Sequence, residues 1–386
     1  MTASSYLSVE LWQAILRYCI GVEDFLDPSA FDGIVLRHLI TDKTTPKCNE
    51  VAYWSAERTR HQLLCVCTSW NAYLLQFEHR FVRMQDILHG KIRPETLKKA
   101  VRVSLSMYTC KCEEHCFSPR AFANFCYDTV REVGQLNVQM VDMGYGEYDI
   151  SDFLGISSNI QHVRTFIALN CRAGRRYARL LQKLPNLHHV YCNGFRGSNE
   201  FVTKGVFESS GLTTLSFHLR GDGKYDNVSW SLPSLRHLRI RGDADYSASS
   251  EFINEAILEI LTALGNQLLS LCLYLRPRQS EMLRTIWILC PQLTLLRASV
   301  PMDSPPPFFH PLHTLVVPSA ADLVDFLPLP DWTNLRRIII DQGTSRLAGM
   351  RIHSSITERL DIRVEDRCGH KLDIFVPRLS LDSLRM

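Results

Sequence analysis

The chain has 386 residues, with 43 lysines and arginines against 40 acidic residues and a net charge of +3. Its 46% hydrophobic and 22% charged residues are close to the average of globular proteins, which excludes a largely disordered chain, and the small net charge gives no sign of a nucleic-acid-binding protein. The N-terminus lacks a secretory signal, no apolar run is long enough to span a membrane, and the 13 cysteines are an odd number, so we expect reduced thiols, no membrane association and a location in the cytoplasm or nucleus.

The first predicted element is a short amphipathic helix that begins near residue 7. Ser8 is suited to the N-cap, and Glu10 to the first turn, where a carboxylate interacts favourably with the helix dipole. The apolar residues that follow recur at the spacing of a helix. We expect them to share one helical face, formed by Leu7, Leu11, Ile15 and Leu16.

A second helical pattern runs through residues 57–74. Its apolar residues would lie on one side of the helix and pack with the first helix in a compact hairpin or trio. The intervening residues 21–56 contain the turn-forming pairs Asp27-Pro28 and Asp32-Gly33 and the sequence Thr44-Thr45-Pro46. We therefore predict a polar surface loop there, with one short helix around residues 34–40. The apolar side of the second pattern is formed by Leu63, Val66, Cys67, Trp70 and Leu74.

Together the two patterns resemble a known family. The motif residues are Leu7, Glu10, Leu11, Ile15, Leu16, Leu64, Val66, Cys67 and Trp70. This pattern is similar to the F-box, and the continuation through residues 77–83 is similar to the F-box-like proteins of mushroom-forming fungi. The resemblance implies that residues 1–85 form a helical module that docks on the small adaptor subunit of a cullin–RING ubiquitin ligase. The docking residues it implies are Leu7, Leu11, Ile15, Leu16, Val66, Cys67 and Trp70.

A cluster of possible metal ligands lies in the segment 86–130, which we expect to connect the helical module to the rest of the chain. The cluster consists of Cys110, Cys112, His115 and Cys116. Soft ligands of this kind bind zinc, but the spacing differs from the two short pairs of a zinc finger or knuckle. We expect no cofactor and take these cysteines as packed beneath the first strands, with metal binding or metal stabilisation as the alternative.

From residue 131 to residue 386 one pattern recurs. An apolar anchor is followed three residues later by a second apolar residue and two residues after that by a third. The mean spacing of the clearest anchors is about 25 residues, as in solenoid repeats. These anchors are Leu187, Leu212, Leu235, Leu268, Leu293, Leu312 and Leu335.

Strand and helix patterns alternate within this repeat. The second and third apolar positions would point together into the core from a short strand, and residues 252–264 carry an apolar helical stripe, with Gly265 just beyond it. This predicts an α/β fold with parallel strands on one side and helices on the other. The repeat resembles the leucine-rich-repeat family, which implies an irregular solenoid with strands on its concave side and helices on its convex side.

Outward residues that flank the third apolar position would form rows across the strands. Tyrosine and arginine, which often anchor protein interfaces, are frequent there. We expect a surface for an acidic or phosphorylated protein segment, with ordinary solvated strand residues as the alternative. The candidate residues are Tyr191, His218, Arg239, Arg241, Tyr274 and Arg297.

The sequence has no motif of an enzyme: no nucleophile elbow, phosphate loop, dinucleotide fingerprint or paired-histidine zinc motif. We therefore expect the chain to catalyse no reaction itself. The resemblance to the F-box family implies a substrate-recruiting subunit of a cullin–RING ubiquitin ligase, and we expect it to be monomeric within its complex and without a nucleic-acid partner. The alternative is an interaction scaffold without ligase association, in which the N-terminal helices only cap the first repeat.

Overall fold

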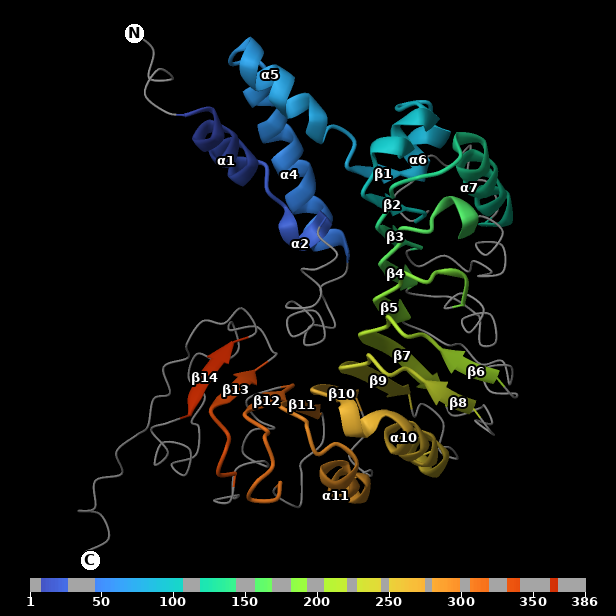
Figure 1. The fold of residues 1–386 in the computed structure, drawn as a ribbon, viewed down its shortest axis with the longest axis vertical. Helices are drawn as coiled ribbons and strands as arrows, with labels where there is room; N and C mark the ends of the chain where they lie inside the picture. Colours follow the sequence, from blue (N-terminus) through green and yellow to red (C-terminus); the bar gives the residue numbers. More distant parts are fainter. Residues whose placement is uncertain are drawn as a thin grey trace, which may run out of the picture. The chain divides into compact units, whose positions relative to one another are not determined.

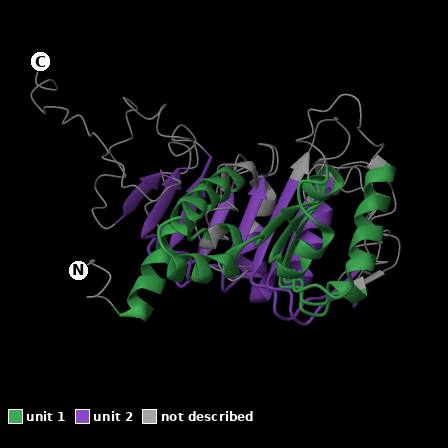
Figure 2. Cartoon of the chain, turned by 90° about the horizontal axis from the view of Figure 1, so that it is seen from above, with its two compact units in different colours: residues 1–34, 42–170, 183–189 green, residues 35–41, 171–182, 190–386 purple. Residues whose placement is uncertain are grey.

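The computed structural model describes residues 8–26, 46–106, 119–143, 157–168, 182–192, 205–220, 228–243, 250–274, 280–298, 306–318, 332–340 and 362–366. Its fold is α/β, built on a twelve-stranded parallel sheet and a separate parallel pair, β6 and β8 (Figure 1). The order of strands in the large sheet is β1-β2-β3-β4-β5-β7-β9-β10-β11-β12-β13-β14, which follows the chain. The chain divides into two compact units, residues 1–34, 42–170 and 183–189, and residues 35–41, 171–182 and 190–386 (Figure 2).

The first unit begins with helices and continues with short parallel strands. Its α-helices are α1 (Val9–Cys19), α2 (Glu23–Leu26), α4 (Pro46–Leu64), α5 (Thr68–Leu74), α6 (Met84–Leu88) and α7 (Pro119–Val133), and its 3-10 turns are η2 (Leu75–Phe77), η3 (Pro94–Lys99) and η4 (Ser157–Asn159). Its strands are β1 (Phe81–Arg83), β2 (Arg102–Ser104), β3 (Met140–Asp142) and β4 (Thr165–Ala168). Strand β5 (His189–Cys192) contains the boundary between the two units.

The loop predicted for residues 21–56 is wrong where the structure describes it. Residues 23–26 form α2, and α4 begins at residue 46. Pro46, which suggested a loop, is the first residue of α4, where its missing N–H leaves no helical hydrogen bond unmade. The helix expected around residues 34–40 lies outside the described residues.

Strands also begin earlier than expected. The first parallel strand starts at Phe81, inside the expected helical module of residues 1–85. The expected connector, residues 86–130, contains β2 and most of α7. Both strands are only three residues long, which is too short for the alternation of apolar and polar residues to stand out in the sequence.

The start of α1 agrees with the prediction. The side chain of Ser8 accepts a hydrogen bond from the backbone N–H of Leu11 at 3.3 Å, so Ser8 is the N-cap. Glu10 lies in the first turn, and hydrogen bonds to the backbone and to Ser8 lower its pKa. The cap therefore fixes where the helix begins.

The second unit consists of parallel strands, and among its described residues helices lie between β9 and β10 and between β10 and β11. Its strands are β6 (Gly205–Glu208), β7 (Thr214–Arg220), β8 (Val228–Ser231), β9 (His237–Asp243), β10 (Ser270–Tyr274), β11 (Leu295–Ala298), β12 (Thr314–Val317), β13 (Arg337–Ile340) and β14 (Arg363–Asp366). Its helices are α10 (Ser250–Leu264), η5 (Gly265–Gln267) and α11 (Ser280–Leu289). The helix predicted for residues 252–264 is thus confirmed as α10.

The recurring apolar positions lie side by side across the second unit's strands. In each adjacent pair from β7 to β13 the second apolar residue of the repeat faces its counterpart, and Ile338 of β13 faces Val364 of β14. All of these side chains are buried, with exposed fractions of 6% or less. A constant register therefore places one apolar row along the inside of the sheet, formed by Leu215, Leu238, Leu271, Leu296, Leu315, Ile338 and Val364.

A buried histidine connects α11 to the segment that enters β12. The Nε2 of His310 lies 3.1 Å from the carbonyl oxygen of Cys290, and its Nδ1 accepts a hydrogen bond from the N–H of Leu312 at 3.3 Å. These contacts require a neutral ring with its proton on Nε2. Burial lowers the pKa of His310 below 6.5.

The lowered pKa of His310 predicts that the second unit loses stability in mild acid. The folded state binds fewer protons than the unfolded chain, so the contribution is complete above pH of about 6.5 and falls as the pH drops below that value. Urea unfolding of the wild type should show a lower midpoint at pH 5.5 than at pH 7.5, and His310→Gln should reduce this difference. The exposed His313 supplies the control His313→Gln; an equal effect of both variants would contradict the prediction.

Candidate functional site

Helix α1 divides its apolar side chains between two faces. Leu16 and Ile20, with exposed fractions of 2% and 0%, are buried in a cluster with Leu74 at the end of α5. Partly buried side chains from α4, α5 and η2 complete the cluster, namely Leu63, Leu64, Trp70, Tyr73 and Phe77. The inner face of α1 therefore holds the N-terminal helices together.

Two further contacts fasten α1 to α5. The rings of Trp12 and Trp70 lie 5.2 Å apart at an angle of 50°. The hydroxyl of Tyr73 donates a hydrogen bond to the carbonyl oxygen of Gln13 at 3.3 Å. Since these residues also lie on the inner side of α1, the orientation of the helix about its own axis is fixed.

The outer face of α1 carries an exposed apolar stripe. Leu11, Ile15 and Tyr18 follow one another at spacings of four and three residues, which places them on the same face. Their exposed fractions are 47%, 38% and 88%. We call these three residues the α1 stripe.

More exposed apolar side chains lie in the same N-terminal region. Val66, in the turn between α4 and α5, is 58% exposed. Of the eleven large apolar side chains that are exposed among the described residues, seven belong to residues 9–75. Apolar residues scattered singly are common on protein surfaces, whereas a contiguous apolar patch marks an interaction site. The seven residues are Val9, Leu11, Ile15, Tyr18, Val51, Val66 and Leu75.

The structure separates the residues expected to dock on a partner. Leu11, Ile15, Val66 and Cys67 are exposed, and Trp70 is partly buried. Leu16 is in the core, so the expectation that it shares a face with Leu11 is wrong. The five-residue spacing places the two about 140° apart around the helix. Leu7 lies outside the described residues. Tyr18 is not among the docking residues predicted from the sequence, although it continues the helical spacing of Leu11 and Ile15.

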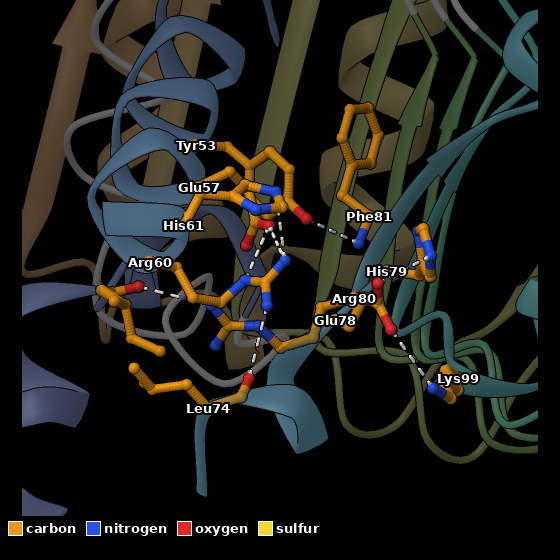
Figure 3. Close-up of polar contacts among 11 residues, drawn as sticks. Tyr53, Glu57, Arg60, His61, Leu74, Glu78, His79, Arg80, Phe81 and Lys99 are labelled. Atoms are coloured by element: carbon orange, nitrogen blue, oxygen red, sulfur yellow. Dashed lines mark hydrogen bonds and ion pairs between the residues drawn. The ribbon is translucent and has the colours of Figure 1, made fainter. Parts of the chain in front are cut away.

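A buried charge cluster supports these helices from α4 (Figure 3). The guanidinium of Arg60 and the carboxylate of Glu57 approach to 2.9 Å, and their side chains are 2% and 9% exposed. Arg60 also donates a hydrogen bond to the carbonyl oxygen of Leu74 at 3.5 Å. The pair therefore connects the middle of α4 to the end of α5.

Tyr53 and Arg80 extend this connection to the first strand and to the end of α1. The Tyr53 hydroxyl accepts a hydrogen bond from the backbone N–H of Phe81 at 3.4 Å, and Arg80 donates one to the carbonyl oxygen of Ile20 at 3.3 Å. Burial raises the pKa of the Tyr53 hydroxyl and lowers the pKa of the Arg80 guanidinium. Phe25, Leu26, Tyr53 and Phe81 form the apolar cluster beside these contacts.

The residues predicted to bind substrate have the expected register in the sheet. Several residues of the predicted outward row, however, are buried. Arg239 pairs with Cys272, and Cys272 with Arg297. Arg297 is only 2% exposed, and Cys272 and Val316 are fully buried. The expectation of a solvent-facing row is therefore wrong in β10, β11, β12 and β13, where apolar side chains form a cluster of their own, consisting of Cys272, Leu295, Val316 and Ile339.

Three of the predicted residues do come together. The guanidinium carbons of Arg239 and Arg297 lie 4.6 Å and 4.1 Å from the ring centre of Tyr274, so two cations flank one aromatic ring. Arg241 pairs with Tyr274 in the neighbouring strand and is partly buried. Tyr191 lies on β5 and is partly buried, and the side chain of His218 lies outside the described residues.

The possible metal ligands Cys110, Cys112, His115 and Cys116 lie outside the described residues. Within the described ranges, no three His, Cys, Asp or Glu side chains are grouped so that they could hold a metal ion. None of the helices among the described residues has the length and the apolar character needed to cross a membrane.

No protein-family model matches the chain, and no curated protein matches it with significant similarity.

The buried position of the Glu57–Arg60 pair predicts a large effect on stability. Arg60→Ala leaves the Glu57 carboxylate buried without its partner, which should lower the free energy of unfolding by about 3–5 kcal/mol. Arg131 and Asp128 form a matched control, since they have the same spacing and the same 2.9 Å distance but side chains 75% and 59% exposed. Arg131→Ala should change the free energy by at most about 1 kcal/mol. Urea unfolding measures both, and similar values would contradict the role given to the pair.

The two faces of α1 should differ in the same assay. Leu16→Ala removes a buried side chain and should destabilise the protein by about 2–5 kcal/mol. Leu11→Ala changes an exposed position and should remain within about 0.5 kcal/mol of the wild type. A loss of stability for Leu11→Ala as large as that for Leu16→Ala would show that the α1 stripe is part of the folded core.

Proposed function

We propose that the protein is the substrate-recruiting subunit of a cullin–RING ubiquitin ligase. In this proposal the N-terminal helices are an F-box-like module that binds the adaptor, and the strand repeat is a leucine-rich-repeat-like solenoid that binds a protein substrate. The subunit catalyses no reaction. It acts by proximity, because holding a substrate on the ligase raises the effective concentration of its lysines near the activated ubiquitin.

The α1 stripe is the observation that carries the proposal. Leu11, Ile15 and Tyr18 are exposed on a helix whose other face is already buried within its own unit. Apolar side chains that a helix presents at i, i+4 and i+7 are the usual anchors of helix-mediated binding. Val66 and Cys67 add exposed residues from the turn between α4 and α5.

The repeat supports the second half of the proposal. Strands β7 to β14 of the large sheet succeed one another in chain order, each parallel to the next and in constant register. Stacking of successive units in this way is typical of solenoids, whose repeated surfaces bind protein partners.

An interaction scaffold with capping helices remains the second candidate, because part of the helical module does cover the first strand. Phe25 of α2 and Tyr53 of α4 pack with Phe81 of β1. A pure cap would explain these contacts, but it would not explain an apolar stripe that faces away from the core of the unit. The presence of both features favours a module with one structural face and one docking face.

Co-purification with the adaptor tests the proposal. The variant Leu11→Asp with Ile15→Asp places two charges in the α1 stripe and should abolish recovery of the adaptor, because neither charge could be paired in an apolar interface. Ile288→Asp is the matched control, since Ile288 is 78% exposed on α11 of the second unit. Wild type and control should recover the adaptor equally. Absence of the adaptor from the wild type, or its undiminished recovery with the double variant, would reject the ligase function.

A further inference from the structure

The turn between α4 and α5 presents two free thiols at the surface. Cys65, Val66 and Cys67 follow one another in this turn, and all three are exposed. Val66, which the two cysteines flank, is 58% exposed. Both thiols therefore lie beside an apolar side chain that is open to solvent.

Hydrogen bonds hold the backbone of this turn. The N–H of Cys65 donates a hydrogen bond to the carbonyl oxygen of Gln62 at 3.2 Å. The carbonyl oxygen of Cys67 accepts one from the N–H of Asn71 at 3.0 Å. The side-chain amide of Asn71 donates to the carbonyl oxygen of Leu64 at 3.1 Å, and Leu64 belongs to the apolar cluster that holds the inner face of α1. The backbone that carries both thiols is thus fixed to the packed helices.

The two thiols differ in their own contacts. The Sγ of Cys65 donates a hydrogen bond to the carbonyl oxygen of His61 at 3.6 Å. Cys67 is the N-cap residue of α5, and its side chain makes no capping hydrogen bond. Reaction at Cys65 therefore gives up an existing hydrogen bond, whereas reaction at Cys67 gives up no capping bond. We expect Cys67 to react faster than Cys65.

Other cysteines of the described residues are in a different environment. Burial raises the pKa of the Cys126 thiol, and it raises the pKa of the Cys290 thiol to about 12. The thiolate is the form that attacks a disulfide, so a buried and protonated cysteine is unreactive. The buried cysteines are Cys126, Cys192, Cys272 and Cys290, and the exposed ones are Cys19, Cys65 and Cys67. Among the described residues, the thiols that a reagent in solution can reach thus lie on α1 and in the turn between α4 and α5.

We propose that Cys65 and Cys67, which we call the thiol pair, are a modification site for low-molecular-weight disulfides such as oxidised glutathione. The thiolate of the protein attacks one sulfur of the reagent, and a mixed disulfide forms between the cysteine and one glutathione. The disulfide bond of the reagent breaks, and the second glutathione leaves and takes up the proton that the cysteine lost. The cysteine sulfur is oxidised and the departing sulfur is reduced, and an excess of reduced thiol reverses the reaction.

The modification would act on the proposed docking residues. Cys67 is one of these residues, and Val66 lies between the two thiols. Glutathione carries a net negative charge, and an unpaired charge is unfavourable in an apolar interface. Modification should therefore release the adaptor, and reduction should restore its binding. This link to the adaptor rests on the proposed function, whereas the modification site itself does not.

Mapping of the modified cysteines tests the site. The full chain is first reduced and then incubated with oxidised glutathione, and its peptides are analysed by mass spectrometry without further reduction. Glutathione should be found on Cys67 and, after longer incubation, on Cys65. The buried Cys126 and Cys290 should remain unmodified as long as the chain is folded. Absence of glutathione from both members of the thiol pair, or its appearance on the buried cysteines at the same rate, would overturn the modification site.

Co-purification with the adaptor tests the consequence. The measured quantity is the ratio of adaptor recovery with glutathione to recovery without it, taken separately for each variant. For the wild type this ratio should fall at least about tenfold and return to its starting value after reduction. The variant Cys65→Ser with Cys67→Ser should show no fall. Cys19→Ser is the matched control, because it removes an exposed thiol outside the pair, and it should respond as the wild type does.

The outcomes separate this proposal from the ligase function. An equal fall for the wild type and the double variant would overturn the role of the thiol pair. If the double variant recovers no adaptor before treatment, the wild type decides: bound adaptor should slow modification of the pair at least about tenfold, since a covered thiol does not meet the reagent, and an unchanged rate would contradict the proposal. Glutathione on the pair of a chain that recovers no adaptor would support the modification site and reject the ligase function.

Discussion

Helix α1 carries apolar side chains on two faces, and it can bury only one of them in its own unit. Leu16 and Ile20 are enclosed with Leu74, so Leu11 and Ile15 have to point away from this core. The contact between Trp12 and Trp70 and the hydrogen bond from Tyr73 to Gln13 fix this choice, because they set the rotation of the helix about its axis. The proposed docking face therefore follows from the packing of the opposite face.

The charge cluster on α4 has a related role. An isolated buried arginine would be strongly destabilising, but Arg60 is satisfied by Glu57 and by the carbonyl oxygen of Leu74. Together with the bond from Arg80 to Ile20, these contacts reach the ends of α1 and α5. The hydrogen bonds are directional, whereas the apolar cluster alone would tolerate small rotations of the helices.

The sequence predicts strands β7 and β9 to β13 well, because the spacing of apolar residues follows directly from the alternation of a strand, and the register of these strands follows the same positions. It does not predict β6 and β8, which lie outside the repeated positions. It predicts much less about burial. Alternation assigns Arg297 to the face opposite Leu296 but does not say whether that face is covered, and Arg297 is buried. Likewise the partner of Arg60 at Leu74 is 14 residues away, and no local pattern encodes such a contact.

The proposed docking face of α1 has a physical arrangement that separates binding from stability. Its exposed apolar side chains stand on a backbone whose hydrogen bonds are the helical bonds and the cap of α1. Folding gains little from these side chains, since burial is the source of apolar stabilisation. Replacing them therefore removes contacts to the proposed partner without removing contacts within the chain.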